Sequence, residues 1–329
     1  MARKAGHSLL GHAKFNKKDE FYTLYPDIER ELKYYECHFK NKVVYCNCDD
    51  VRFSKFYRYF ADNFSKLSLK KLICSCYTRD ELSLFNISPK HGFYYEYTGF
   101  ENSNPEIDDV THFMGDGDFR STESIELLKQ SDIVVTNPPF SLFREYLRQL
   151  MKYGKKFLII SNINAITYKE VFTLIQANKI WLGVNFGRGI SGFIVPEEYE
   201  LYGTETHTDE EGRRIISPNN CLWLTNLDNT RKHESIPLKR TYYGHELEYP
   251  SYDNYPAINI DKTQNIPADY FGAMGVPLSF LHKHNPEQFT ILGFRKGIDG
   301  KDLAINGKCT YFRILVRRSD SAYTCNRRD

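Results

Sequence analysis

The clearest chemistry in this 329-residue sequence lies in the four residues Asn137-Pro138-Pro139-Phe140. The side-chain carbonyl of Asn137 and the backbone carbonyl of Pro138 are two acceptors on a stiff backbone, and they suit an exocyclic amino group with two N–H donors. Phe140 adds an aromatic face on which a planar base can stack. Because the lone pair of such an amino group is delocalised into its ring, two acceptors that hold its hydrogens favour a more pyramidal, more nucleophilic nitrogen. The four residues therefore predict a site for a base such as adenine.

A buried strand must position this loop. Ile133-Val134-Val135 is a β-branched run, and the prolines end the strand because neither can donate to a sheet ladder. The loop is thus expected at the carboxyl end of a strand, where open α/β sheets bind ligands. The alternative is a strand that merely ends in a proline turn. The aromatic residue and the predicted helix that follow favour the site.

Acidic and hydroxyl side chains follow other elements of the first half. The predicted strand 42–48 runs into Asp49 and Asp50, where the cation or ribose of a cofactor would lie. Helix capping by one of these acids is the alternative. Thr23 precedes a helix expected to start near Pro26, and it could cap that helix or line a pocket.

A glycine-rich segment provides a further candidate site. The weak strand predicted at 111–114 runs into Gly115-Asp116-Gly117-Asp118-Phe119. Glycine permits close approach of the backbone to a ligand, Asp118 can accept from an amino group, and Phe119 can stack on a ring. A tight turn without a ligand is the alternative.

Apolar periodicity predicts the elements between these sites. Strands are expected at 42–48, 71–77, 111–114, 133–135, 156–161 and 180–184, and helices at about 26–35, 54–67, 122–130, 141–153 and 168–178. This alternation predicts an α/β fold with a mixed, mostly parallel sheet and helices on both faces. The polar segment 79–109 is expected to be irregular.

The pattern changes after Asn185. Glycines, tyrosines and charged residues dominate to about Tyr255, and strand-like segments return at 221–227, 274–280 and 311–316. We therefore predict a catalytic domain over 1–184 and a second functional region over 185–329.

Charge and cysteine usage limit the class of protein. The net charge of +2 does not indicate a nucleic-acid partner, although both termini are basic and could be solvated tails or arms that contact phosphates. Cys46-x-Cys48 and Cys74-x-Cys76 have a gap that suits zinc poorly, with no histidine nearby, so we expect reduced core thiols rather than a metal site. No apolar run suits a membrane span and no secretory signal pattern is present, so a cytoplasmic protein is expected.

Together these motifs resemble the EcoRI-type adenine-specific DNA methyltransferases. The likeness runs nearly end to end, through DEFYT, VVYCNCDD, GDGDFR, SDIVVTNPPFSLF, GRGISGFIVPE, SPNNCLWLTNLD and NGKCTYFRIL. It implies a Rossmann-like methyltransferase domain, S-adenosylmethionine as methyl donor, and a DNA target-recognition region towards the C-terminus. It also implies a monomer that acts on duplex GAATTC in a bacterial or phage setting and guards host DNA from a matching endonuclease.

The resemblance also implies roles for single residues. The residues that it places around a flipped adenine are Asn137, Pro138, Pro139 and Phe140. It implies that Asp118 and Phe119 contact the adenine of the cofactor, Thr23 its methionine carboxylate, and Asp49 its methionyl or ribose part. The usual glycine-rich loop after the first strand is replaced by Cys46-Asn47-Cys48-Asp49, and no acid directly ends the second strand, so no ribose partner is assigned.

Arg231, Lys232 and His233 are the candidates for DNA contact, because basic and polar loop residues contact phosphates and read base edges. His233 is the candidate for the loop that fills the gap left by a flipped base. Two rival functions remain. An RNA or protein-glutamine methyltransferase could use the same NPPF loop, but it would not need the long region after Asn185. A DNA-binding relic without activity would be expected to have lost Asn137 or Phe140.

Overall fold

The computed structural model describes residues 22–78, 91–186, 189–195, 206–209, 212–217 and 220–319. The basic segment 1–18 and the arginines 327 and 328 lie outside these ranges. The chain forms two compact units: unit 1 comprises Met1–Thr167 and Asn185–Leu227, and unit 2 comprises Tyr168–Val184 and Asp228–Asp329.

Unit 1 holds most of the predicted strands and helices. Its described α-helices are α2 (Tyr25–Leu32), α3 (Lys55–Asp62), α4 (Thr122–Gln130) and α5 (Phe143–Lys152). Its described strands are β1 (Tyr22–Thr23), β2 (Val43–Asn47), β3 (Lys71–Cys76), β4 (Phe93–Tyr97), β5 (Thr111–His112), β6 (Ile133–Thr136), β7 (Lys156–Asn162), β9 (Phe193–Ile194), β10 (Thr206–Thr208), β11 (Arg214–Ile216) and β12 (Cys221–Thr225). The expectation of an irregular segment at 79–109 was wrong for β4, and residues 79–90 lie outside the described residues.

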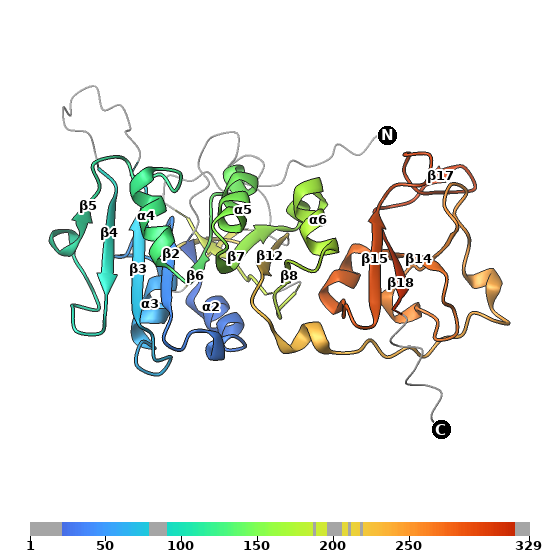
Figure 1. The fold of residues 1–329 in the computed structure, drawn as a ribbon, viewed down its shortest axis with the longest axis horizontal. Coiled ribbons are helices and arrows are strands. Elements are labelled where there is room, and N and C mark those ends of the chain that lie inside the picture. Colours follow the sequence, from blue (N-terminus) through green and yellow to red (C-terminus); the bar gives the residue numbers. More distant parts are fainter. Residues whose placement is uncertain are drawn as a thin grey trace. The chain divides into compact units, whose positions relative to one another are not determined.

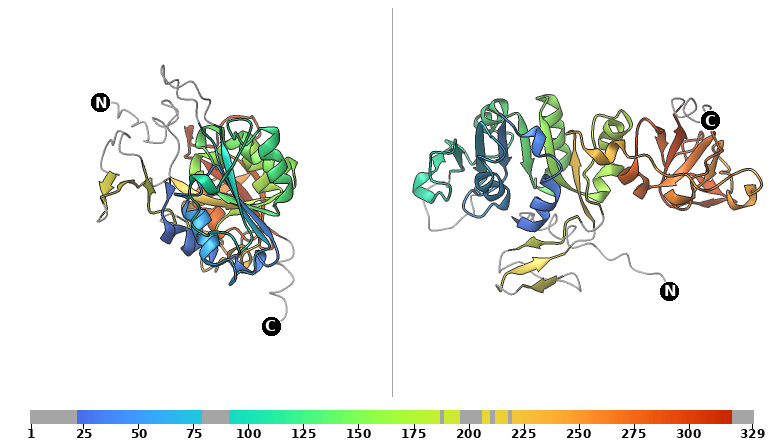
Figure 2. Two further views of the ribbon diagram at one scale, coloured as in Figure 1. Left: turned by 90° about the vertical axis from the view of Figure 1, so that its left-hand side faces the viewer. Right: turned by 90° about the horizontal axis from the view of Figure 1, so that it is seen from below.

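The larger sheet of unit 1 confirms the predicted α/β class and the parallel centre. Its strands run in the order β5-β4-β3-β2-β6-β7-β12. The central strands β3, β2, β6 and β7 are parallel, whereas β4, β5 and β12 are antiparallel to their neighbours. Helices α4 and α5 cover one face and α2 and α3 the other (Figures 1 and 2). Every residue of β2 and β6 is buried, as expected for strands covered on both faces.

A small sheet, β1-β9-β11-β10, extends from the larger one within unit 1 (Figure 2, right). The sequence predicted none of its strands. Beside it, Ser191 donates from its backbone N and its Oγ to the buried carboxylate of Asp27 on α2, at 2.7 and 2.8 Å. Gly192 is required where these segments meet, because a Cβ there would lie 2.6 Å from Cγ2 of Ile215. Strand β1 and helix α2 are thus both joined to the glycine-rich segment 189–195.

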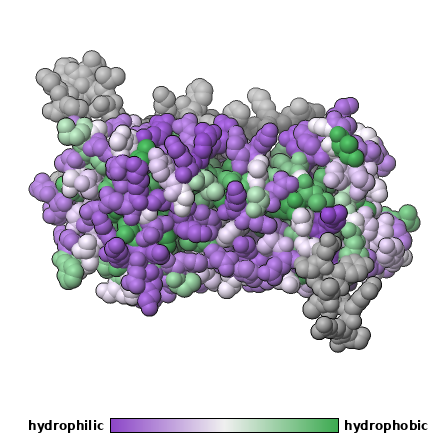
Figure 3. Space-filling view, viewed as in Figure 1, coloured by the Kyte–Doolittle hydropathy of each residue, from purple (hydrophilic) through white to green (hydrophobic). Residues whose placement is uncertain are grey.

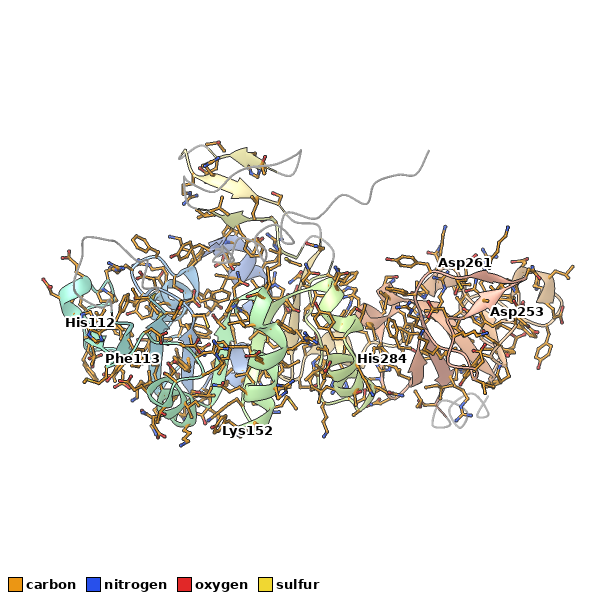
Figure 4. The ribbon with its side chains drawn as sticks, turned by 90° about the horizontal axis from the view of Figure 1, so that it is seen from above. His112, Phe113, Lys152, Asp253, Asp261 and His284 are labelled. Carbon is orange, nitrogen blue, oxygen red and sulfur yellow. The ribbon has the colours of Figure 1, made fainter. Side chains whose placement is uncertain are left out.

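Among its described residues, unit 2 has a four-stranded sheet, on which an α-helix packs, and a two-stranded sheet. Its elements are α6 (Lys169–Gln176), β8 (Trp181–Leu182), β13 (Ala257–Asn259), β14 (Ala273–Pro277), β15 (Phe289–Phe294), β16 (Ala304–Ile305), β17 (Lys308–Cys309) and β18 (Arg313–Arg318). The sheet order is β13-β14-β18-β15, and the rings of Phe172 on α6 and Phe294 on β15 stack at 4.8 Å. Asp253 and Asp261 lie on loops of this unit (Figure 4), and Asp253 accepts from the backbone N of Gly307 in the β16–β17 turn at 2.8 Å.

The compact units do not follow the predicted division at residue 184/185. Strands β9, β11 and β12, which come after residue 185, pair with strands of unit 1. Helix α6, which comes before residue 184, packs within unit 2. The catalytic role of 1–184 and the recognition role of 185–329 stay predictions.

Polar side chains cover much of the surface shown in Figure 3. Among the described residues, no helix has the length and apolar character that a membrane span requires. Cys46 and Cys74 are fully buried and lie opposite each other on β2 and β3, as expected for core thiols, while Cys48 and Cys76 are half-buried.

Candidate active site

The carboxyl ends of β2 and β6 lie side by side. These parallel strands pair at Val44 and Tyr45 of β2. Beyond these pairs, Oγ1 of the fully buried Thr136 is within hydrogen-bond distance of the backbone O of Asn47 and lies 2.6 Å from Oδ2 of Asp49. The residue that precedes Asn137 therefore touches the segment that follows β2.

The Asn137–Phe140 loop follows β6 directly, as predicted. Asn137 is half-buried and Pro138 buried, and the backbone O of Pro139 accepts from the N of Leu142 at 3.1 Å as the 3-10 helix η3 (Phe140–Leu142) begins. The ring of Phe140 lies 6.4 Å from that of Phe193 on β9, at 66°. The loop is thus short and backed by packed elements. Its role in holding adenine stays a prediction.

Asp49 is a buried carboxyl at the end of β2. Cys48, with φ of 63°, turns the chain, and the backbone N of Asp49 donates to the O of Ser75 at 2.9 Å. Burial raises the pKa of Asp49 to about 7, although hydrogen bonds from Thr136 and Ser54 lower it. A carboxyl in this state can gain or lose a proton near neutral pH.

Capping of the next helix does not explain the two acids. The N-cap of α3 is Ser54, whose Oγ accepts from the backbone N of Tyr57 at 3.1 Å. Asp50 instead forms an ion pair with Arg52, whose Nε lies 2.9 Å from Oδ1. The capping alternative was therefore wrong for both Asp49 and Asp50.

The Gly115–Phe119 segment approaches the end of β3. It follows the buried Phe113 at the edge of the sheet (Figure 4). Gly117 has φ of 80°, and a Cβ there would lie 2.5 Å from the backbone O of Cys76. Both oxygens of Asp118 accept from Arg120, at 2.7 and 2.8 Å, and this partner lowers the pKa of Asp118. Asp118 is therefore an ionised acceptor with lone pairs to spare.

Helix α5 joins this segment to the other loops. The buried ring of Phe119 packs edge-on against Tyr146 at 5.1 Å, and Gln149 donates to the backbone O of Phe119 at 2.8 Å. The hydroxyl of Tyr146 donates to Oδ1 of Asn47 at the end of β2. Sequence reasoning missed Asn47, Thr136 and Tyr146. Asn47 and Thr136 lie within the motifs that carry the resemblance, whereas Tyr146 was expected only at an apolar position of a helix.

Thr23 reaches the same region through β9. It pairs with Phe193, whose ring faces Phe140. Thr23 is 3% exposed, and its Oγ1 has no hydrogen-bond partner among the residues that the structure describes. A buried hydroxyl left unpaired costs about 1–3 kcal/mol, so a polar atom of a ligand fits here. Contacts within unit 1 thus link the four parts of the candidate site, which are Thr23, Asp49, the Asp118 segment and the Asn137 loop.

The predicted DNA-contacting residues lie in unit 2, on the 3-10 helix η5 (Thr230–His233). Arg231 pairs with Glu234 at 3.0 Å, and His233 Nε2 lies 2.9 Å from Asp228. The Nζ of Lys232 lies 3.5 Å from the centre of the Trp181 ring, and this side chain is 18% exposed. Lys232 is thus largely occupied by packing, while its two neighbours are more exposed. Among the described residues, no group of three or more histidines, cysteines and acids could hold a metal ion.

Comparison with known proteins identifies the family. The family model described as adenine-specific methyltransferase EcoRI matches residues 9–319. The chain is 65% identical to the type II methyltransferase M.EcoRI of Escherichia coli, over 96% of this chain and 98% of that protein. It is 36% identical to M.MgeORF184P of Mycoplasma genitalium and 37% identical to M.MpnI of Mycoplasma pneumoniae, each over 93% of this chain and 97% of the relative. No solved structure matches the chain significantly. The chain therefore belongs to the family of EcoRI-type adenine-specific methyltransferases.

Proposed function

We propose that this protein transfers a methyl group from S-adenosylmethionine to N6 of the adenine within GAATTC that its NPPF loop holds, and so protects the DNA from a restriction endonuclease of the same specificity. The observation that carries the proposal is the direct contact between Thr136, which precedes the Asn137–Phe140 loop, and Asp49 at the end of β2. Identity of 65% to M.EcoRI supports GAATTC as the target. The parallel centre of the sheet supports a Rossmann-like methyltransferase domain.

The residues present fit S-adenosylmethionine, which would supply a methyl group already activated by its sulfonium. The unpaired hydroxyl of Thr23 would donate to the methionine carboxylate. The buried carboxyl of Asp49 would lie near the methionyl part, and Asp118 would accept from the amino group of the cofactor adenine. The ring of Phe119, held by Tyr146, would border that adenine.

The target adenine must leave the duplex, because N6 cannot be reached inside the base stack. The carbonyl groups of Asn137 and Pro138 would then accept from the two hydrogens of N6, and Phe140 would stack on the base. This arrangement would hold N6 for attack on the methyl group that the cofactor supplies, so catalysis would be chiefly positioning. The protein forms no covalent bond to the base, and the N6 proton leaves for solvent after transfer.

Recognition of the target would involve the region after residue 185, with Arg231, Lys232 and His233 on η5. His233 is 46% exposed at its side chain and remains the candidate to fill the gap left by the flipped base. The packing of Lys232 on Trp181 favours Arg231 over Lys232 as a DNA contact. We propose that the protein acts as a monomer, without a stable complex with the endonuclease.

A protection assay tests this function. Plasmid DNA with GAATTC sites is incubated with the protein and S-adenosylmethionine and then challenged with an endonuclease that cuts GAATTC. We expect protection that requires the cofactor, with no protection against an endonuclease that cuts GGATCC. Methyl transfer without protection at GAATTC would contradict the proposed target, and no transfer to DNA would contradict the activity.

A further inference from the structure

We propose that Asp49 carries a proton while the cofactor site is empty and releases it when a sulfonium binds, so that it distinguishes the cationic methyl donor from its neutral thioether product. The inference rests on the proposed function, because it takes S-adenosylmethionine and S-adenosylhomocysteine as the ligands. It concerns a charge-sensing role of the carboxyl group, beyond its contact with the cofactor.

The hydrogen bonds of Thr136 point to a protonated Asp49. Oγ1 of Thr136 has one hydrogen but lies within hydrogen-bond distance of two acceptors, the backbone O of Asn47 and Oδ2 of Asp49. If the hydroxyl donates to Asn47, the 2.6 Å contact with Oδ2 needs a hydrogen from the carboxyl group of Asp49. That distance is normal for an O–H···O bond. A neutral Asp49 therefore satisfies all three oxygen atoms.

The surroundings of Asp49 also disfavour a charge. The ionisable side chains around it are Cys46, Cys48, Asp50, Cys74 and Tyr146. Burial raises the pKa of Cys46, Cys74 and Tyr146, so these groups stay neutral near pH 7 and offer no positive charge. Asp50 carries a like charge that is paired with Arg52. Thus Asp49 is 8% exposed, and among the described residues no cation is paired with it.

A sulfonium would supply the missing cation. Asn137 and Pro138 hold N6, and the methyl group must be in line with it, so the sulfonium lies close to this loop. Thr136 precedes Asn137 and touches Asp49, so the carboxyl contacts the residue next to this loop. An opposite charge within several ångströms favours the ionised form of a buried acid. Binding therefore moves the proton from Asp49 to solvent, and the carboxyl takes a proton back when only the neutral thioether remains.

Calorimetry measures directly how many protons are released when a ligand binds. The full-length protein is titrated with S-adenosylmethionine and with S-adenosylhomocysteine between pH 5.5 and 8.5, in buffers of different ionisation enthalpy. At pH 6, a pKa of about 7 leaves about 0.9 of a proton on Asp49, so up to that amount is released with the sulfonium. Below pH 7, the Kd for S-adenosylmethionine should rise up to about tenfold per pH unit. Proton uptake or release that both ligands cause equally cancels in the difference.

Two variants separate Asp49 from its neighbour. Asp49→Asn keeps an N–H donor for Thr136 but cannot titrate, so the difference in proton release between the two ligands should vanish. Asp50→Asn removes the adjacent acid and should keep the difference. If Asp49→Asn does not fold, the midpoint of release in Asp50→Asn serves instead, because loss of the like charge that raises the pKa of Asp49 should move this midpoint to lower pH.

Three results would overturn the inference. The wild-type protein could release equal numbers of protons with both ligands, Asp49→Asn could keep the difference, or Asp50→Asn could leave the midpoint of release in place. If the wild-type protein binds S-adenosylmethionine and methylates DNA but releases the same number of protons with both ligands, only the role of Asp49 is refuted. Absence of S-adenosylmethionine binding at every pH would refute the proposed function as well.

Discussion

Replacing Thr136 with valine removes the contact that joins the two loops of the candidate site. Valine keeps the β-branched shape at a fully buried position of β6 and deletes only the hydroxyl. The backbone O of Asn47 and Oδ2 of Asp49 then each lose a hydrogen-bond partner. Because no bulk changes elsewhere, any loss of activity reports on these two bonds.

The expected magnitude follows from the burial of both oxygen atoms. A buried polar group left unpaired costs about 1–3 kcal/mol, so we expect the free energy of unfolding to fall by about 2 kcal/mol. Asn137 is the next residue, and a displacement of about 1 Å at a reacting group can cost roughly 10²-fold in rate. The kcat for methylation should therefore fall by roughly that factor.

Thr225→Val is the matched control. Thr225 on β12 is also fully buried in the same sheet, and its Oγ1 donates to the backbone O of Phe157 at 2.6 Å, away from the Asn137 loop. Urea denaturation and single-turnover methylation of a GAATTC duplex are measured for both variants. We expect similar losses of stability, but a loss of kcat for Thr136→Val alone. Equal kcat values for the two variants would refute the idea that Thr136 positions Asn137.

Three further predictions concern the cofactor, pH and DNA. Asp118→Ala should weaken S-adenosylmethionine binding by about 1–3 kcal/mol in calorimetry, whereas Glu145→Gln, on the far side of the Arg120 ion pair, should not. Because the native state raises the pKa of Asp49 from 3.8 to about 7, it binds this proton more tightly than the unfolded chain, and the carboxyl costs stability as pH rises from about 4 to 7. In urea denaturation, the free energy of unfolding of Asp49→Asn should therefore rise by a few kcal/mol relative to that of the wild type between pH 4 and pH 8. A variant-minus-wild-type difference that does not change with pH would contradict the raised pKa. Arg231→Ala should make the salt dependence of DNA binding shallower by about one, whereas Lys232→Ala should lower stability and leave this slope unchanged, because Lys232 packs on Trp181. A shallower slope for Lys232→Ala alone would contradict this ranking.

The sequence predicts the elements whose patterns are local. The helix predicted at 122–130 has the same bounds as α4 in the structure, where the side chain of Ser121 caps its first turn. Strand β6 was predicted from a β-branched run that two prolines end. The places of Asp49, Asp118 and Asn137 beyond strand ends follow from the same reasoning, since residues after the parallel strands of one sheet gather at one edge.

Other features depend on contacts between distant segments. The strands of the small sheet have two or three residues, too few for a periodic pattern, and β1 is stabilised by pairing with β9 about 170 residues later. Strand β4 alternates buried and half-buried aromatic and polar residues, but glycine and polar flanks concealed it. The bonds from Thr136 and Tyr146 to Asn47 join residues that are 89 and 99 positions apart, and no local pattern indicates them.

The most direct test of the adenine site compares wild type with Asn137→Ala in single-turnover methylation of a GAATTC duplex, with the product bases identified by nucleoside mass spectrometry. We expect the wild-type protein to produce N6-methyladenine within GAATTC. Loss of the positioned acceptor should lower the rate for Asn137→Ala by about 10²-fold or more, with the affinity for S-adenosylmethionine unchanged. A methyl group on any other base, or near-normal turnover by Asn137→Ala, would contradict the assignment of this loop.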